Sequence, residues 1–285
     1  VSTLALPSLN SVAGDFDVLN NSSLTDFSAF SESGVERTIG GRLYVYNNGP
    51  ADGSPSFAMT ALDTVGTHIG FRDNNFTSVS LGVTHIPEYL YFRNNERLES
   101  VTMDSLSTIG RFLDYLDNGE DSASGTVVSF AGLTSVGEYV DFDGYDSGSH
   151  GRLASVTLGA GASGTPLVVG DGDGTEYLAF DSWDTTDYAI HADALTEVKG
   201  EIDIYDTNCA EVNLENLTTV GSYFELNSTA VSTLSLPSLN SVAGDFDVVN
   251  NSSLTDFSAF SASGVDRTIG GRLYVNNNGP TDGSP

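Results

Sequence analysis

Acidic side chains on a glycine-rich segment are the residues of this sequence best suited to chemistry. Asp171, Asp173 and Glu176 lie in the stretch GDGDGTE, which begins at Gly170. Carboxylate oxygens on a flexible backbone are ligands that calcium prefers, so these three residues form a candidate calcium site. A solvated acidic turn is the alternative, because the stretch lacks the final glutamate and the flanking helices of an EF-hand loop.

A second candidate pair for calcium, Asp141 and Asp143, lies two residues apart in the run DFDGYD. Paired carboxylates also serve as acid and nucleophile in glycoside hydrolases. Hydrolysis requires an apolar pocket that raises the pKa of one carboxyl group, and the sequence indicates no such pocket. Solvation at the surface is therefore the preferred interpretation of this pair.

Other reactive side chains lack a motif. Cys209 has no second cysteine with which to pair, so an internal disulfide is excluded. No glycine-rich segment is followed by the helix that a phosphate-binding site needs. The sequence predicts no catalytic residue and no certain cofactor, with calcium the one candidate. The four histidines stand far apart, without the spacing of metal ligands: His68, His85, His150 and His191.

Charge limits the partners of this chain. Ten lysines and arginines oppose 39 aspartates and glutamates, which gives a net charge of −29 over 285 residues. Such a charge repels phosphates and excludes nucleic acid as a partner. No apolar run approaches the length of a transmembrane helix, so no membrane span is expected in this segment. Lys199 is the only lysine, a composition that fits either adaptation to concentrated salt or a secreted calcium-binding protein.

A long repeat determines the organisation of the chain. Residues 1–55 return at 231–285 with six differences, so the period is 230 residues. Residues 1–230 therefore form one full period, and 231–285 begin a near-identical second period that continues the first. Similarity extending to loop serines indicates recent duplication in a tandem array. The sequence opens at Val1 without features of a targeting signal, and it is expected to be a piece of a longer array.

A shorter repeat predicts the architecture. Each coil is numbered from an apolar position 0, and positions 4 and 6 are apolar in all nine coils of the period. Alternation of this kind is strand periodicity, with both side chains facing one interior. One strand per coil, stacked at about 4.8 Å, predicts an all-β, right-handed parallel β-solenoid of about nine coils per period. Position 0 is assigned to Val12, Ile39, Val65, Ile86, Ile109, Val136, Gly174, Val198 and Val220.

Positions 5, 7 and 8 carry mostly polar side chains. Position 8 holds asparagine, aspartate, serine or glycine, residues that tolerate a left-handed backbone, so each is expected to end a strand at a corner. Positions 5 and 7 point outward and bring carboxylates of neighbouring coils close together. Such repulsion predicts that the surface requires cations. The stacked carboxylates are Asp114 with Asp141, Asp143 with Asp181, and Asp203 with Glu225 and Asp247.

The pattern L-x-x-[VI]-x-G-x-[FL]-x-[VI]-x-N-N-x-x-L runs over residues 9–24 and partly over 36–48. It resembles the coils of receptor L domains, which occur in insulin- and EGF-type receptors, fungal cell-wall proteins and bacterial surface proteins. The resemblance covers most coils and is weak at 144–176. It implies a leucine-rich right-handed solenoid outside the cell without catalytic activity. The near absence of cysteine, the long period and the acidic charge depart from the family, so receptor signalling is not implied.

These observations predict a non-enzymatic structural segment of a long extracellular fibre, stalk or adhesin shaft on a cell surface. Its expected partners are further copies of the repeat, head-to-tail and lateral, together with surface glycans or proteins. A glycan- or protein-binding module is the alternative, with outward Tyr44, Tyr46 and Tyr91 as contacts. A polysaccharide-active β-helix enzyme is a third interpretation, opposed by the scarcity of basic residues. Glycosylation candidates are the sequons at Asn75, Asn216, Asn227, Asn20 and Asn250.

Overall fold

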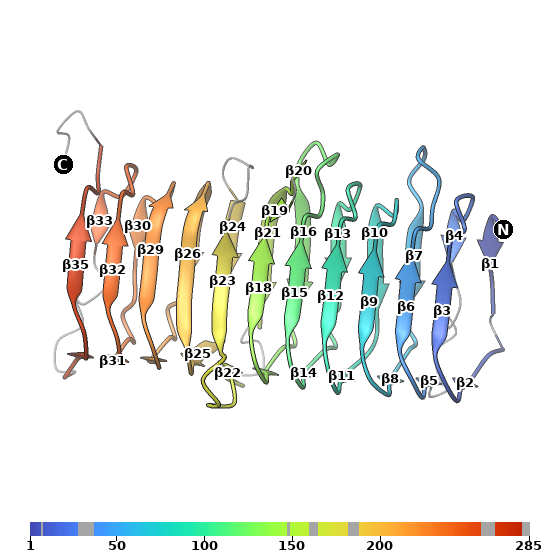
Figure 1. The fold of residues 1–285 in the computed structure, drawn as a ribbon, viewed down its shortest axis with the longest axis horizontal. Coiled ribbons are helices and arrows are strands. Elements are labelled where there is room, and N and C mark those ends of the chain that lie inside the picture. Colours follow the sequence, from blue (N-terminus) through green and yellow to red (C-terminus); the bar gives the residue numbers. More distant parts are fainter. Residues whose placement is uncertain are drawn as a thin grey trace.

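The computed structural model describes residues 1–6, 8–27, 37–146, 149–159, 165–181, 188–257 and 266–280. The chain winds into one rod of stacked coils, with its two ends at opposite ends of the rod (Figure 1). Three sheets run along the rod, with nine, eleven and eleven strands, and every pairing within them is parallel. The prediction of an all-β parallel β-solenoid is therefore confirmed. None of the described residues forms a helix able to span a membrane.

Most coils contribute one strand to each of the three sheets. Sheet A contains β1 (Thr3–Leu4), β4 (Asp26–Phe27), β7 (Ser56–Met59), β10 (Ser78–Leu81), β13 (Ser100–Thr102), β16 (Thr126–Phe130), β21 (Leu153–Leu158), β24 (Tyr188–His191) and β27 (Cys209–Asn213). Sheet B contains β2 (Ser11–Val12), β5 (Thr38–Ile39), β8 (Thr64–Val65), β11 (His85–Ile86), β14 (Thr108–Ile109), β17 (Ser135–Val136), β22 (Leu167–Val169), β25 (Leu195–Val198), β28 (Thr219–Val220), β31 (Ser241–Val242) and β34 (Thr268–Ile269). Sheet C contains β3 (Phe16–Leu19), β6 (Leu43–Tyr46), β9 (Ile69–Arg72), β12 (Leu90–Arg93), β15 (Leu113–Leu116), β18 (Val140–Asp143), β23 (Tyr177–Asp181), β26 (Glu201–Thr207), β29 (Phe224–Thr229), β32 (Phe246–Val249) and β35 (Leu273–Asn276). Two further pairs are antiparallel β19 (Tyr145–Asp146) with β20 (Ser149–His150), and parallel β30 (Thr233–Leu234) with β33 (Asp256–Phe257).

Two features of the coil differ from the sequence prediction. One strand per coil was expected, but most coils contribute three. Position 0 and the residue before it form a short strand of sheet B, and a further strand after position 8 joins sheet A. The assignment of Gly174 to position 0 is wrong. Val169 takes that place, since it pairs with Val136 on one side and with Val198 on the other. Residues 170–176 instead lie between β22 and β23, as an acidic loop added to the coil.

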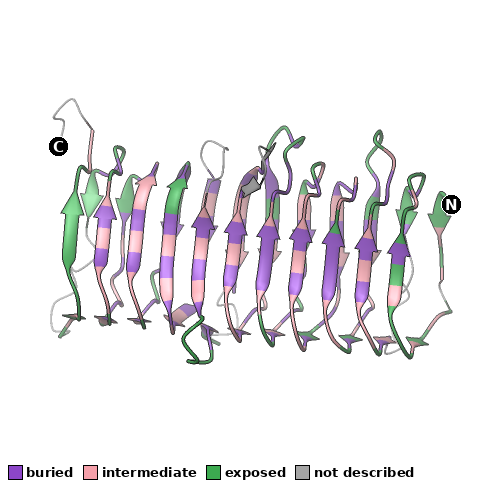
Figure 2. Cartoon of the chain, viewed as in Figure 1, coloured by how far each residue is buried: buried purple, intermediate pink, exposed green. Residues whose placement is uncertain are grey.

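Positions 4 and 6 face the interior of the rod, as predicted. The alternation of buried and partly exposed residues along sheet C is visible as purple and pink stripes (Figure 2). Position 6 forms an internal aromatic column with ring centroids 4.9 to 5.9 Å apart. Every ring in it is at most 1% exposed, so the predicted spine is confirmed. Its members are Phe71, Phe92, Tyr115, Phe142 and Phe180.

Position 8 adopts the predicted left-handed backbone in most coils, but β26 and β29 continue one residue past it, to Thr207 and Thr229, and Gly144 is not left-handed. Nine such residues have a φ between 45° and 58°, which asparagine and aspartate adopt more readily than most residues. Ser182 at this position lies outside the described residues. The left-handed residues are Asn20, Asn47, Asp73, Asn94, Asp117, Asp206, Ser228, Asn250 and Asn277.

Position 9 adds a buried asparagine ladder that the sequence analysis missed. The side-chain oxygen of each asparagine accepts hydrogen bonds from the backbone N–H and the amide of its equivalent one coil earlier, at 2.8 to 3.1 Å. Each amide from Asn48 onward also donates to a backbone carbonyl of the preceding coil. The ladder therefore satisfies buried polar groups at the corner where sheet C ends. It comprises Asn21, Asn48, Asn74, Asn95 and Asn118, and it resumes at Asn251 and Asn278.

We expect Phe92→Ala to lower the free energy of unfolding by about 3–5 kcal/mol, because it opens a cavity in the internal column. Phe112→Ala is the matched control, since that ring stacks on the outer face of the neighbouring coil. Its loss should cost about 1 kcal/mol. Urea unfolding of both variants measures the difference, and equal costs would show that the assignment of inner and outer faces is wrong.

Candidate functional site

The acidic loop between β22 and β23 gathers its three predicted ligands. Oxygens of Asp171, Asp173 and Glu176 lie within 4.8 Å of one another. The loop is able to fold this tightly because Gly170, Gly172 and Gly174 adopt φ values of 97° to 102°. Two of the carboxylates are exposed, whereas Glu176 is only 5% exposed.

Backbone N–H groups already donate hydrogen bonds to some of these carboxylate oxygens. Gly172 and Gly174 donate N–H hydrogen bonds to the two oxygens of Glu176, the second at 3.0 Å. Burial by itself would raise the pKa of Glu176, but these backbone donors outweigh burial and lower it. Asp171 Oδ1 accepts the Asp173 N–H at 3.1 Å, and Asp173 Oδ1 accepts the Thr175 N–H at 3.2 Å. A cation would compete with N–H donors at Glu176, so the Oδ2 atoms of the two aspartates are its most accessible ligands.

Asp141 and Asp143 point outward from β18, as expected from the alternation. Asp141 lies beside Asp114 of β15 and accepts a hydrogen bond from the Tyr177 hydroxyl at 3.4 Å. Burial, followed by the charges of Asp114 and Asp143, raises the pKa of Asp141 to about 7. Asp143 lies beside Asp181 of β23. Within the described ranges these residues join no group of three metal ligands, so calcium binding at this pair stays a prediction.

The carboxylates at position 5 are stacked in the predicted register. Asp203, Glu225 and Asp247 are Cα partners on β26, β29 and β32. Burial and the charge of Glu225 raise the pKa of Asp203 to about 6. Asp114 is different, because it is only 2% exposed and forms an ion pair with Arg93.

An outer aromatic row crosses sheet C at position 3, and the sequence analysis missed it. Its signal is present in the sequence, since four successive coils carry an aromatic residue in this column. Ring centroids lie 4.3 to 4.9 Å apart with interplanar angles of 0° to 18°. Each inner ring has both faces covered by its neighbours, so the row presents ring edges and hydroxyl groups outward. The row contains His68, Tyr89, Phe112, Tyr139 and Tyr177.

The three predicted outward tyrosines form a smaller cluster beside this row. Tyr44 lies 6.0 Å from Tyr46 and 6.5 Å from Tyr91, measured between ring centroids. Arg42 lies over Tyr44, and Arg93 lies over Tyr91. Cations of the chain itself therefore already contact two of these rings.

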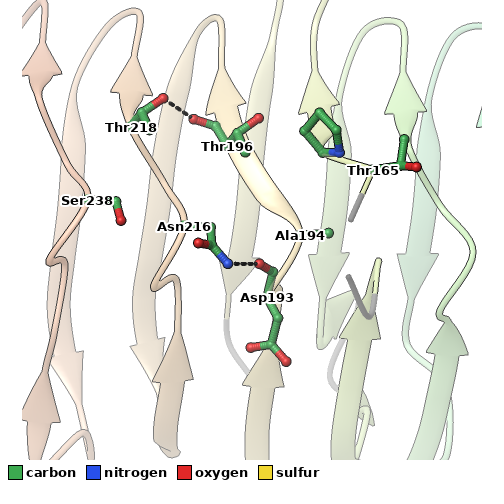
Figure 3. Close-up of a pocket in the computed structure, with 8 residues that line it drawn as sticks. Thr165, Asp193, Ala194, Thr196, Asn216, Thr218 and Ser238 are labelled. Carbon is green, nitrogen blue, oxygen red and sulfur yellow. Dashed lines mark hydrogen bonds between the residues drawn. The ribbon is translucent and has the colours of Figure 1, made fainter. Parts of the chain in front are cut away.

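A polar groove of about 380 Å³ crosses the turns that lead into sheet B (Figure 3). Asn216 donates its amide to the Asp193 carbonyl at 2.7 Å, and Thr218 donates its hydroxyl to the Thr196 carbonyl at 2.8 Å. The lining can hydrogen-bond a polar ligand, but its described residues include no histidine or basic side chain. It consists of Thr165, Pro166, Asp193, Ala194, Thr196, Asn216, Thr218 and Ser238.

The glycosylation candidates differ in accessibility. Asn20, Asn216 and Asn250 are exposed, whereas Asn75 and Asn227 are half-buried. Asn75 donates its amide to the Gly49 carbonyl, and Asn227 donates its amide to Glu225. Modification of any of them stays a prediction.

The lone thiol is an unsuitable nucleophile. Cys209 is fully buried on β27, and burial raises its pKa to about 12. Thiolate is the reactive form of cysteine, so this thiol is inert at neutral pH.

Comparison with protein-family models, with characterised proteins and with solved structures found no match for this chain.

We expect the protein to be more stable at pH 5 than at pH 8, because ionising Asp141 is costly in the folded state. With a folded pKa of about 7 and an ordinary unfolded value near 4, the folded state holds an extra proton between these values. Stability should therefore fall as pH rises through about 7. Asp141→Asn should recover on the order of 1–2 kcal/mol at pH 8, after allowance for partial exposure. Thermal melting from pH 5 to 8 tests this, with exposed Asp121→Asn as control, and an unchanged profile in Asp141→Asn would contradict it.

We also expect sodium chloride to raise the melting temperature, because it screens the stacked carboxylates. Calcium at constant ionic strength should raise the melting temperature further if the acidic loop binds it. The double variant Asp171→Asn, Asp173→Asn keeps both Oδ1 acceptors of the loop and removes two charges, so it should abolish only the calcium response. Indifference to both salts would contradict the importance assigned to carboxylate repulsion.

Proposed function

We propose that this chain is a non-enzymatic segment of a tandem-repeat fibre, stalk or adhesin shaft on the outside of a cell. The observation that carries the proposal is continuity across the repeat boundary. Strand β29 of the first period pairs with β32 of the second, with Phe224 opposite Phe246. The same in-register pairing joins strands inside a period, so the rod can lengthen without a change in its cross-section.

The two copies of the repeated segment support coil-on-coil extension. Leu43 and Val45 of the first copy pair with Phe16 and Val18. Their counterparts Leu273 and Val275 pair in the same register with Phe246 and Val248. The repeated sequence therefore stacks on the preceding coil in the same way in both periods.

The outer aromatic row also supports a structural role over the alternative of glycan binding. Sugars stack on the faces of aromatic rings, and here each inner ring, such as Phe112, is covered on both faces at 4.8 and 4.9 Å. The repeat pattern at residues 9–24 resembles receptor L domains, whose proteins work at cell surfaces. That resemblance is the basis for an extracellular location and for a leucine-rich type of repeat.

The test is the length of the particle as periods are added. A protein with one more 230-residue period should be longer by about 43 Å, from nine coils at about 4.8 Å each. Small-angle X-ray scattering measures this length. A compact particle whose maximum dimension does not grow would contradict a shaft.

Location is tested separately with antibodies raised against the 285-residue chain. The proposal requires labelling of intact cells of the source organism, with antibodies to a cytosolic protein as the negative control. Labelling that appears only after permeabilisation would contradict a role at the cell surface and leave the rod architecture intact.

A further inference from the structure

The outer face of sheet C divides into a basic part and an acidic part on either side of β15. This face is the front row of arrows in Figure 1, and its side chains come from positions 3, 5 and 7 of each coil. Arginines lie on or beside β6, β9 and β12, on one side of β15. On the other side, β18, β23 and β26 carry carboxylates and contain no arginine or lysine.

The arginines retain exposed donors although each already contacts a carboxylate of its own chain. The side chains of Arg42, Arg72 and Arg93 are 38%, 50% and 43% exposed. Arg42 reaches Asp17, and Arg93 reaches Asp114. A guanidinium has five N–H donors, so each can bind a second carboxylate from outside.

Consider a second copy related by a two-fold axis that is parallel to the strands and lies over β15. This axis places the basic part of each copy opposite the acidic part of the other. Such an axis reverses the direction of the rod and keeps the strands parallel, so it brings together strands equally distant from β15. Strand β12 then faces β18, β9 faces β23, and β6 faces β26 of a second copy. Residues at the same coil position lie opposite one another.

Three opposite-charge pairs result from this operation. Arg93 faces Asp143, and Arg72 faces Asp181, because all four lie in the register column at position 7, with Leu116 of β15 between Arg93 and Asp143. Arg42 faces Glu201 in the column at position 3, where Glu201 is the Cα partner of Tyr177. Every arginine at these positions of the basic strands thus meets a carboxylate.

The centre of the face is mainly aromatic, and it also holds Arg111, which is 52% exposed and paired with Glu138, and half-buried Asp141 of β18. Phe112 lies next to the axis and meets its own equivalent, while Tyr89 meets Tyr139, its near neighbour in the outer aromatic row. Asp114 also lies near the axis, but it is 2% exposed and paired with Arg93. Tyr46 would meet Tyr205, which is 43% exposed.

The charge complementarity between the two copies ends beyond β6 and β26. One strand further out, β3 would face β29 and bring Asp17 against Glu225. The matched surface therefore covers the seven strands from β6 to β26, about 34 Å along the rod and about 15 Å across. Roughly 500 Å² per partner is near the lower limit for a specific interface, which indicates weak association.

We propose that two copies of this protein associate face to face through sheet C, with their rods antiparallel and the two-fold axis over β15. An isologous interface of this kind closes after two copies, and its charged pairs fix the register. This lateral contact does not depend on the role in a fibre, because it uses only residues within one period.

The test is a charge exchange followed by sedimentation velocity. The wild-type chain should show a concentration-dependent monomer–dimer equilibrium that weakens with added salt. Arg72→Glu and Asp181→Arg each create two like-charge contacts in the homodimer, so each should weaken dimerisation by about tenfold or more. An equimolar mixture of the two variants should restore it, because in the mixed dimer both contacts are again of opposite charge.

Two controls separate recognition from folding and from net charge. Circular dichroism and thermal melting establish that each variant keeps its fold. Asp121→Arg makes the same change in charge as Asp181→Arg but lies in an exposed loop, so it should dimerise like the wild type. A wild-type chain that stays monomeric at millimolar concentration, single variants that dimerise normally, or a mixture that stays monomeric would each overturn the proposal.

Discussion

Every side chain of this solenoid must tolerate its own equivalent about 4.8 Å away, and the rest of the structure depends on this constraint. Inside the rod the constraint is favourable. Aliphatic and aromatic side chains gain contact area by stacking on their like, as Phe71 does on Phe92. An asparagine is also suited to it, because its amide donates and its oxygen accepts along the same axis, as between Asn48 and Asn74.

Outside the rod the same constraint is unfavourable for charge. A carboxylate stacked on a carboxylate loses solvation and gains repulsion, which is why the pKa values of Asp141 and Asp203 are raised. The chain relieves this at some coils by placing an arginine on the next strand, as Arg272 does for Asp247. Strands β18, β23 and β26 themselves contain no arginine or lysine, and their outer face is acidic.

The inner columns could be predicted from sequence because alternation at positions 4 and 6 persists through every coil. The two-residue strands of sheet B could not, since two residues carry no periodicity. The error at Gly174 has a specific cause, because the apolar columns resume four residues later at Leu178 and the added acidic loop shifts the count. The three carboxylates of that loop were found from composition, but the N–H donors around Glu176 depend on backbone angles that sequence does not specify. The pair of Arg93 with Asp114 was not predictable, because it joins position 7 of one coil to position 5 of the next and depends on side-chain conformations that sequence does not specify.

The asparagine ladder gives the rod a direction. Between asparagines, each donates to its equivalent in the following coil and accepts from its equivalent in the preceding one, as Asn74 donates to Asn95 and accepts from Asn48. A growing end on the C-terminal side therefore presents N–H groups that lack an acceptor, and the next segment of chain supplies the oxygen. Folding that proceeds from the N-terminus, as a chain emerges from a ribosome or a secretion channel, meets such a template at the coils that carry the ladder, from Asn21 to Asn118 and again at Asn251. The order in which the polypeptide is made thus coincides with the order in which its polar groups can be satisfied.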